Sequence, residues 1–244
     1  MYEPSIVDAR GGRIPDTEDP ITSQLVDLIV RTGIGGRLPT ERNLAEELNV
    51  SRTLLRDRLT LLEALGVIQR RSGQGTFVQP LDANRLGNAL DIGLQLTDHT
   101  TESLQSVRTA LERQAAAEAA QRIDRLNVAK MQIAMDVIRE SPSNAAVEQA
   151  DFEFHAALMK ASGNSSIVFF ADALGVPLRR SFAERRKILE RIPHQHELMI
   201  ELHEAILNAV LAQNPTAAKE SVDAHFDRYD AEVAALMLSE TQTA

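Results

Sequence analysis

Apolar residues recur at helical spacing in three short segments near the N-terminus. The first predicts a helix over residues 20–32, which the glycine-rich stretch TGIGGRLP ends. Its apolar positions are Ile21, Leu25, Leu28 and Ile29. Thr40 can cap a second helix, ERNLAEEL, and Ser51 can cap a third, SRTLLRDRLTLLEAL, which Gly66 stops. Asn49 lies between the last two and predicts a tight turn, because asparagine tolerates left-handed backbone.

Two short β-like runs, VIQR and TFVQ, follow the third helix. The stretch RSGQG joins them, and its glycines and polar residues predict a hairpin turn. The order helix, helix, tight turn, helix, hairpin is that of a winged helix-turn-helix.

The rest of the chain has a helical pattern almost to its end. We expect a flexible arm over residues 1–19, the winged helix-turn-helix over 20–80, a linker or short helix over 81–100, a helical domain over 101–238 and a tail over 239–244. The helices of the second domain are predicted at 101–122, 124–139, 145–162, 165–188, 194–213 and 215–238. Gly175 and Pro177 should kink or split the helix at 165–188. The predicted fold is mainly α, with three helices and a β-hairpin wing before an all-α bundle.

Charge is distributed unevenly along the chain. The net charge is −9, yet residues 21–80 hold eight arginines against six acidic residues, while residues 81–244 hold 16 basic and 24 acidic residues. Only the first domain is therefore expected to face nucleic acid. The sequence has no cysteine, no apolar run long enough for a membrane span and no apolar stretch typical of a secretory signal. These features predict a cytoplasmic protein that does not contact membranes.

The third predicted helix has an apolar side and a polar side. At roughly 100° per residue, its leucines fall within an arc of about 160°, and Arg52 and Arg56 lie outside that arc near the helix N-terminus. A recognition helix has this form, because its apolar side docks on the other helices and its forked donors reach base edges. The helix N-terminus can also bind a phosphate, and Arg42 could contact the DNA backbone. A solvated amphipathic helix is the alternative.

The stretch LPTERNLAEELNVSRTLLRDRLTLLEALGVIQRRSGQGTFV resembles the DNA-binding domain of the GntR family of bacterial regulators. The resemblance covers residues 21–79 and includes LPTER, VSR and the GxGTFV wing. It implies that six residues contact an operator in double-stranded DNA: Arg42, Ser51, Arg52, Arg56, Gly73 and Gly75. Two positions depart from the family pattern. Asn49 replaces a usual glycine, and Arg58 replaces a usual alanine inside the leucine arc, where it should snorkel or pair with a carboxylate.

Four residues of the second half could converge on a metal ion. Asp151 and His155 are four positions apart on one predicted helix. His203 and His225 lie roughly 16 Å and 15 Å along their helices from the break at Asn214-Pro215, so a helical hairpin would bring them level. Three imidazoles and a carboxylate suit a divalent Zn, Ni, Mn or Fe ion. Separate surface or core histidines are the alternative.

Residues 101–238 resemble the FCD effector domain, an all-α bundle found behind many GntR-family DNA-binding domains. The matching pieces are VRTALERQAAAEAA, DFEFHAALMKASGN and HEAILNAVLAQNPTAAKESVDAHF. The resemblance implies that Asp151, His155, His203 and His225 hold a divalent metal beside an organic-acid effector. It also suggests that Arg108 faces the effector carboxylate, although a structural salt bridge would explain Arg108 equally well.

The sequence therefore predicts a ligand-responsive regulator, a repressor of a metabolic operon, that senses a small organic or sugar acid. A homodimer on a near-palindromic operator is expected, because one short helix reads too few bases for useful specificity. A metal-dependent enzyme acting on a small acid is one alternative, and a regulator with a purely structural metal is another. The sequence lacks a G-x-S-x-G elbow, a P-loop and a dinucleotide-binding glycine pattern, so no catalytic residue is predicted.

Overall fold

The chain folds into two compact units, residues 1–85 and 86–244, in the computed structural model. The structure describes residues 19–97, 101–189, 191–192 and 194–243. The predicted N-terminal arm lies outside these residues except for Asp19.

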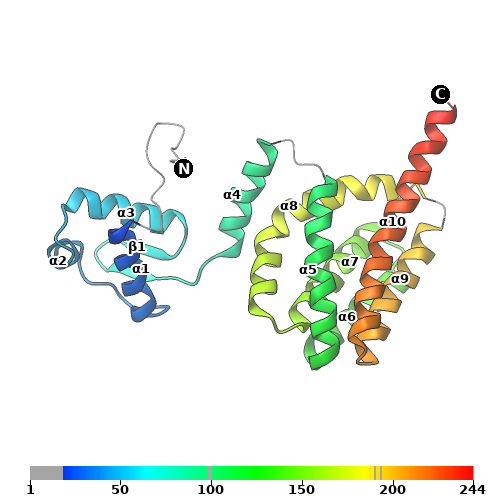
Figure 1. Ribbon diagram of the computed structural model, residues 1–244, viewed down its shortest axis with the longest axis horizontal. Coiled ribbons are helices and arrows are strands. Elements are labelled where there is room, and N and C mark those ends of the chain that lie inside the picture. The colour runs from blue at the N-terminus through cyan, green and yellow to red at the C-terminus, as the bar shows by residue number, and fades with distance from the viewer. Residues whose placement is uncertain (1–18, 98–100, 190, 193, 244) are drawn as a thin grey trace, which may run out of the picture. The chain divides into compact units, whose positions relative to one another are not determined.

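The described residues of the first unit form three helices and a two-stranded hairpin, before the start of α4 (Figure 1). The helices are α1 (Pro20–Thr32), α2 (Glu41–Glu47) and α3 (Arg52–Ala64), and the strands are β1 (Ile68–Arg71) and β2 (Gly75–Val78). The strands pair antiparallel, with Ile68 opposite Val78. The predicted winged helix-turn-helix is confirmed.

Polar side chains at the helix starts and left-handed residues after α2 and α3 set the helix boundaries of the first unit. The Thr40 and Ser51 side chains accept hydrogen bonds from the backbone N–H groups of Asn43 and Leu54, which caps α2 and α3 as predicted. Asn49 has φ 50° in the turn before α3, and Gly66 has φ 81° directly after it. The residue choices that determine these boundaries are therefore local.

The apolar side of α3 faces the core of the first unit. Leu55, Leu59 and Leu62 are buried there against Leu25 of α1 and Leu44 of α2. The end of the leucine arc is less enclosed, since Leu65 is 50% exposed. Burying one face leaves the opposite face of α3 at the surface.

Arg58 joins α3 to the start of α1. Its Nε donates to Oδ2 of Asp19 over 2.9 Å. The same carboxylate caps α1 by accepting from the backbone N–H of Thr22. Burial opposes ionisation of Asp19, but the hydrogen bonds from Thr22 and Arg58 outweigh it and lower the Asp19 pKa. The structure thus supplies the carboxylate partner that the sequence leaves unidentified.

Replacing Asp19 by alanine is expected to destabilise the full chain by about 0.5–2 kcal/mol, because the cap of α1 and the partner of Arg58 are lost together. Asp19→Asn keeps a capping oxygen but no charge, so its loss should be smaller. Urea denaturation followed by circular dichroism measures both variants. Equal stability of wild type and Asp19→Ala would contradict this account of the contact.

The regular elements among the described residues of the second unit are all helices (Figure 1). Its helices are α4 (Ala83–Gln95), which starts in the last residues of the first unit, α5 (Thr101–Arg122), α6 (Arg125–Glu140), α7 (Asn144–Ala161), α8 (Ser165–Leu189), α9 (Gln195–Leu211) and α10 (Pro215–Thr243). Helix α4 occupies most of the segment predicted as a linker or short helix. Helix α8 continues through Pro177, and Figure 1 shows it bending rather than splitting. Among the described residues, no helix has the length and apolar character needed to cross a membrane.

The core of the second unit lies mainly between α5, α6, α7, α9 and α10. Apolar side chains such as Phe154, Leu158, Ile206 and Phe226 fill it. Several polar side chains are buried in the same bundle, including Arg108, Glu112, Asp151, His155, His203 and His225. Polar groups are costly in such a position unless they are paired or bind an ion, so this cluster requires a physical explanation.

Candidate DNA-binding surface and metal centre

The polar side of α3 carries the residues predicted to read DNA. Ser51 at its N-terminus and Arg52 in its first turn are exposed. The Arg56 side chain is 68% exposed, and its Nε lies 2.7 Å from Oε2 of Glu41. Arg42 on α2 is 69% exposed, with Nε 3.7 Å from Oε1 of Glu46. The arrangement leaves guanidinium groups at the surface near two helix N-termini.

Glu41 is a residue of this surface that the sequence reasoning missed. It lies 15 positions before Arg56, at the first position of α2. Its side chain is 30% exposed and holds the Arg56 guanidinium in one place. No motif or spacing links the two residues, so only the three-dimensional fold identifies the pair.

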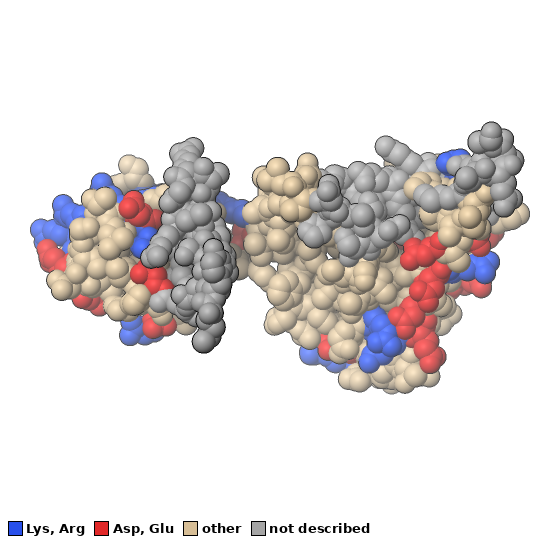
Figure 2. Space-filling model, turned by 45° about the horizontal axis from the view of Figure 1, so that its top comes forward, with Lys and Arg blue, Asp and Glu red and all other residues tan. Residues whose placement is uncertain are grey.

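The hairpin wing has glycine at two left-handed positions. Gly73 has φ 71° and Gly75 has φ 111°. A Cβ added to Gly75 would lie 2.7 Å from Nε of Arg37. Beside the wing a hollow of about 280 Å³ reaches the start of α2, and Arg70 and Arg71 also line it. Figure 2 shows basic side chains of this unit at its surface, next to acidic ones.

Gly75→Ala is expected to weaken DNA binding several-fold, because alanine disfavours φ 111° and its Cβ would displace Arg37. Gly93 is the matched control, since it lies in helix α4 with open space around its Cβ position. Electrophoretic mobility shifts compare the two variants. Equal binding by Gly75→Ala and wild type would show that the wing tolerates the change.

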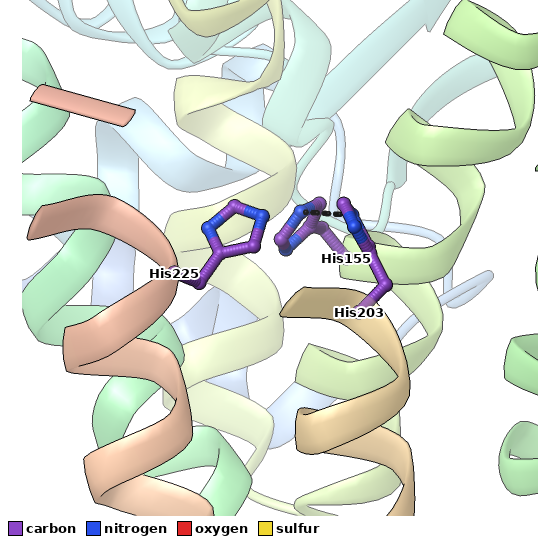
Figure 3. A group of neighbouring side chains, drawn as sticks. All are labelled: His155, His203 and His225. Carbon is purple, nitrogen blue, oxygen red and sulfur yellow. Dashed lines mark hydrogen bonds between the residues drawn. The ribbon is translucent and has the colours of Figure 1, made fainter. Parts of the chain in front are cut away.

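The four predicted metal ligands come together in the second unit. Asp151 and His155 lie on α7, His203 on α9 and His225 on α10. The three histidines each offer a ring nitrogen within 4.8 Å of the others. Oδ1 of Asp151 lies 2.7 Å from Nε2 of His203 and 3.4 Å from Nε2 of His155. Figure 3 shows the three rings turned toward one another from their separate helices.

A hydrogen bond on the outer side of the His203 ring determines which of its two nitrogens faces Asp151 and His155. Nδ1 of His203 lies 2.7 Å from the backbone oxygen of Met199, which only accepts, so Nδ1 must donate. In a neutral His203, Nε2 then presents a lone pair to the Asp151 carboxylate. Nε2 of His155 lies 3.2 Å from Nε2 of His203. Acceptors gathered so closely require a shared cation or proton between them.

His225 is the third ring of the cluster. It is 4% exposed, and neither of its ring nitrogens has a hydrogen-bond partner. Burial first, and then the neighbouring His203 and His155, lower the His225 pKa well below its usual value. The ring is therefore neutral, which is the form that binds a metal, and its orphaned nitrogens fit the role of a ligand.

The carboxylate of the cluster is charged despite its position. Burial alone would raise the Asp151 pKa, but the neighbouring His155 and His203 outweigh it and hold the pKa well below its usual value. One buried carboxylate and three imidazoles form a donor set that fits a divalent transition metal.

A second buried carboxylate, Glu112 on α5, was missed in the sequence. Its Oε2 lies 2.5 Å from Nδ1 of His155, and its Oε1 lies 2.6 Å from Nε of Arg108. Burial opposes ionisation, but Arg108 and His155 outweigh it and lower the Glu112 pKa to about 2. Arg108, predicted to contact an effector, is thus buried in the same cluster with a salt bridge. Its Cζ lies 5.4 Å from the ring centre of Phe226.

A winged helix-turn-helix with exposed arginines, joined in one chain to a helical domain with a buried cluster of histidines and carboxylates, is the architecture of a DNA-binding regulator with a second, helical domain. The model of the "Bacterial regulatory proteins, gntR family" matches residues 18–78, and that of the "FCD domain" matches residues 103–228. The chain belongs to the GntR family of bacterial transcription regulators and carries an FCD domain, which confirms the resemblance seen in the sequence.

Individual relatives agree with this membership. The "HTH-type transcriptional regulator LutR" of Bacillus subtilis is 30% identical over 78% of this chain and 88% of its own length. The "Putative L-lactate dehydrogenase operon regulatory protein" of Escherichia coli is 29% identical over 78% of this chain and 75% of its own. The solved structure "Streptococcus agalactiae GntR" has the same fold, with a TM-score of 0.62 at 24% identity over 84% of this chain and 95% of that one. The relatives described here are named as regulators rather than enzymes.

Proposed function

We propose that this protein is a repressor of a metabolic operon. Its affinity for DNA responds to a small organic or sugar acid bound at a metal ion. The observation that carries the proposal is the presence, in one chain, of exposed arginines on α3 and a buried cluster of three histidines and Asp151. The first can bind an operator and the second can bind a signal.

Asp151, His155, His203 and His225 would hold the metal, which is a divalent Zn, Ni, Mn or Fe ion. A metal held there would supply positive charge that attracts the carboxylate oxygen of an acid. Arg108 is the cationic side chain of this chain best placed to take part in holding an acid, because it is buried beside the ligands through Glu112. The orphaned nitrogens of His225 support this reading over a purely structural polar cluster.

The relatives support the metabolic part of the proposal. One of them is named for an L-lactate dehydrogenase operon, a set of genes for the metabolism of a small organic acid. An acid of this chemical class fits a site that combines a metal with a guanidinium group.

The expected DNA partner is a near-palindromic operator bound by a homodimer in the cytoplasm, where bacterial DNA lies. The exposed base-reading side chains of one protomer lie on the short helix α3, which reads only a few bases. Two protomers related by a two-fold axis would read two half-sites and supply the specificity that one helix lacks.

Selection from a library of random duplexes tests the proposal. The purified full chain should enrich a sequence with two inverted half-sites, and analytical ultracentrifugation of the complex should give two protomers per duplex. Folded protein that enriches no sequence over the input library would contradict the regulator assignment. Enrichment of a single half-site by a monomer would contradict the dimer.

A further inference from the structure

Glu112 is a buried carboxylate that is neither one of the predicted metal ligands nor one of the apolar side chains that form the core. It is fully buried, and both of its oxygens are engaged. One oxygen accepts from Arg108, four residues earlier on the same helix, and the other lies against the outer nitrogen of His155 on α7. Arg108, Glu112 and His155 therefore form a continuous chain of contacts that ends at the histidine cluster.

The contact with Glu112 has a direct chemical consequence for His155. A neutral imidazole carries its proton on either nitrogen, and the acceptor beside the ring decides which one. The Glu112 carboxyl group is paired with the Arg108 guanidinium and accepts on its other oxygen, so the proton of His155 lies on Nδ1. The lone pair then lies on Nε2, which is the atom that approaches Asp151 and His203.

Arg108 makes this arrangement rigid. Its Nε donates to Oε1 over 2.6 Å, which leaves Oε2 directed at the imidazole. The guanidinium also balances the charge of a carboxylate in an apolar bundle, where an unpaired charge would be strongly disfavoured. Without Glu112, Arg108 would lose its carboxylate partner and His155 its outer acceptor at the same time.

We infer that Glu112 is a positioning residue of the metal centre, which fixes His155 in the tautomer whose Nε2 binds the metal and is itself held by Arg108. This inference rests on the metal site of the proposed function. Outer partners of this kind typically change metal affinity 10- to 100-fold when they are removed. Glu112 lies on α5, a helix that contributes none of the four ligands, so the metal centre takes its positioning residue from a fourth helix.

Zinc affinity of the full chain, measured by competition with a chelator of known affinity, tests the inference. Glu112→Gln should weaken zinc binding about 10- to 100-fold. The matched control is Glu118→Gln, because Glu118 lies on the same helix and accepts from Gln114 and Asn164 but touches no ligand. Its zinc affinity should equal that of wild type.

The outcomes separate the inference from the proposal beneath it. Wild-type zinc binding that Glu112→Gln leaves unchanged would overturn the role of Glu112 and leave the metal site intact. Absence of zinc binding in wild type would overturn both.

A spectroscopic measurement on wild type decides the matter even where Glu112→Gln fails to fold. Ring ¹⁵N spectra of the zinc-loaded protein distinguish a protonated nitrogen from a metal-bound one, and His155 is assigned by comparison with His155→Gln. The inference expects a proton on Nδ1 of His155 and zinc on Nε2. Zinc bound through Nδ1, or a proton on Nε2, would overturn it.

Discussion

His225→Leu is expected to abolish the stabilisation of the protein by added metal while leaving the metal-free protein at least as stable as wild type. A ligand present at 100 times its dissociation constant stabilises the native state by about 2.7 kcal/mol, so wild type should gain this amount and the variant should gain nothing. Few substitutions combine a complete loss of a ligand effect with preserved folding.

The preserved stability follows from the surroundings of His225. Both ring nitrogens are buried without a hydrogen-bond partner, and each such group costs about 1–3 kcal/mol in a folded protein. Leucine removes that cost and has a similar volume. It also loses edge contacts with four rings, and each such pair is worth about 0.5–1.5 kcal/mol. The ring centres lie 4.7 Å away for His203 and Phe226, 4.9 Å for His155 and 5.2 Å for Tyr229. The two effects are of similar size, so the metal-free stability should change little or rise.

Urea denaturation with excess zinc and with a chelator measures both quantities. His196→Gln is the control, because His196 is an exposed histidine outside the cluster and should leave the zinc effect intact. Full zinc stabilisation of His225→Leu would remove His225 from the ligand set. A metal-free variant that is several kcal/mol less stable than wild type would show that the ring has polar partners.

Arg52→Ala and Arg56→Ala are each expected to cost about 1–3 kcal/mol of operator discrimination, roughly a 5- to 150-fold loss in affinity. Both side chains are exposed on the polar face of α3, near its N-terminus. Neither contributes to the core, which Leu55, Leu59 and Leu62 supply from the opposite face, so folding should be unaffected.

Titration of each variant on the selected operator and on unrelated DNA separates base reading from backbone contact. A base-reading arginine should lose affinity for the operator far more than for unrelated DNA, whereas a phosphate contact lowers both. Arg113→Ala is the control, because Arg113 is an exposed residue of α5 in the second unit and pairs with Asp223. Unchanged operator affinity in both α3 variants would contradict the recognition-helix assignment.

The elements of both units could be predicted from the sequence because their signals are local. Thr40 and Ser51 cap their helices with hydrogen bonds to residues three positions ahead, and Gly66 ends α3 in the left-handed conformation. Gly175 and Pro177 are a local signal of the same kind. They predicted a kink or a split in the helix, and α8 bends but continues through Pro177 (Figure 1).

The cluster of candidate metal ligands could be predicted from the sequence, because the number of residues in a helix gives the distance along it. Equal distances from the break at Asn214-Pro215 place His203 and His225 at one level, and the structure brings both rings to the α7 pair. Glu112 had no such signal. It lies in VRTALERQAAAEAA, whose charged residues have the spacing of an ordinary solvated helix face. Its burial against Arg108 and His155 arises only when α5 packs on α7 and α10.

The carboxylate partners of Arg56 and Arg58 could not be predicted from the sequence either, because they also depend on how the helices pack. Glu41 and Asp19 lie 15 and 39 positions away in the chain, and ion pairs of that separation depend on how the helices pack. The sequence predicted that Arg58 would snorkel or find a carboxylate, and it pairs with Asp19. The sequence could not identify which carboxylate would pair with Arg58. Residue type thus predicts the need for a partner, and the fold supplies it.

In the proposed function, the bound metal and the acid together control the affinity of the protein for operator DNA. The direct measurement is the affinity of the full chain for its selected operator, with and without zinc and, in each case, with and without an organic or sugar acid that raises the melting temperature of the zinc-loaded protein. The account predicts that the acid changes operator affinity about 5- to 150-fold in the zinc-loaded protein and leaves the metal-free protein unaffected. An operator affinity that is the same in all four conditions, or an equal acid effect without metal, would contradict it.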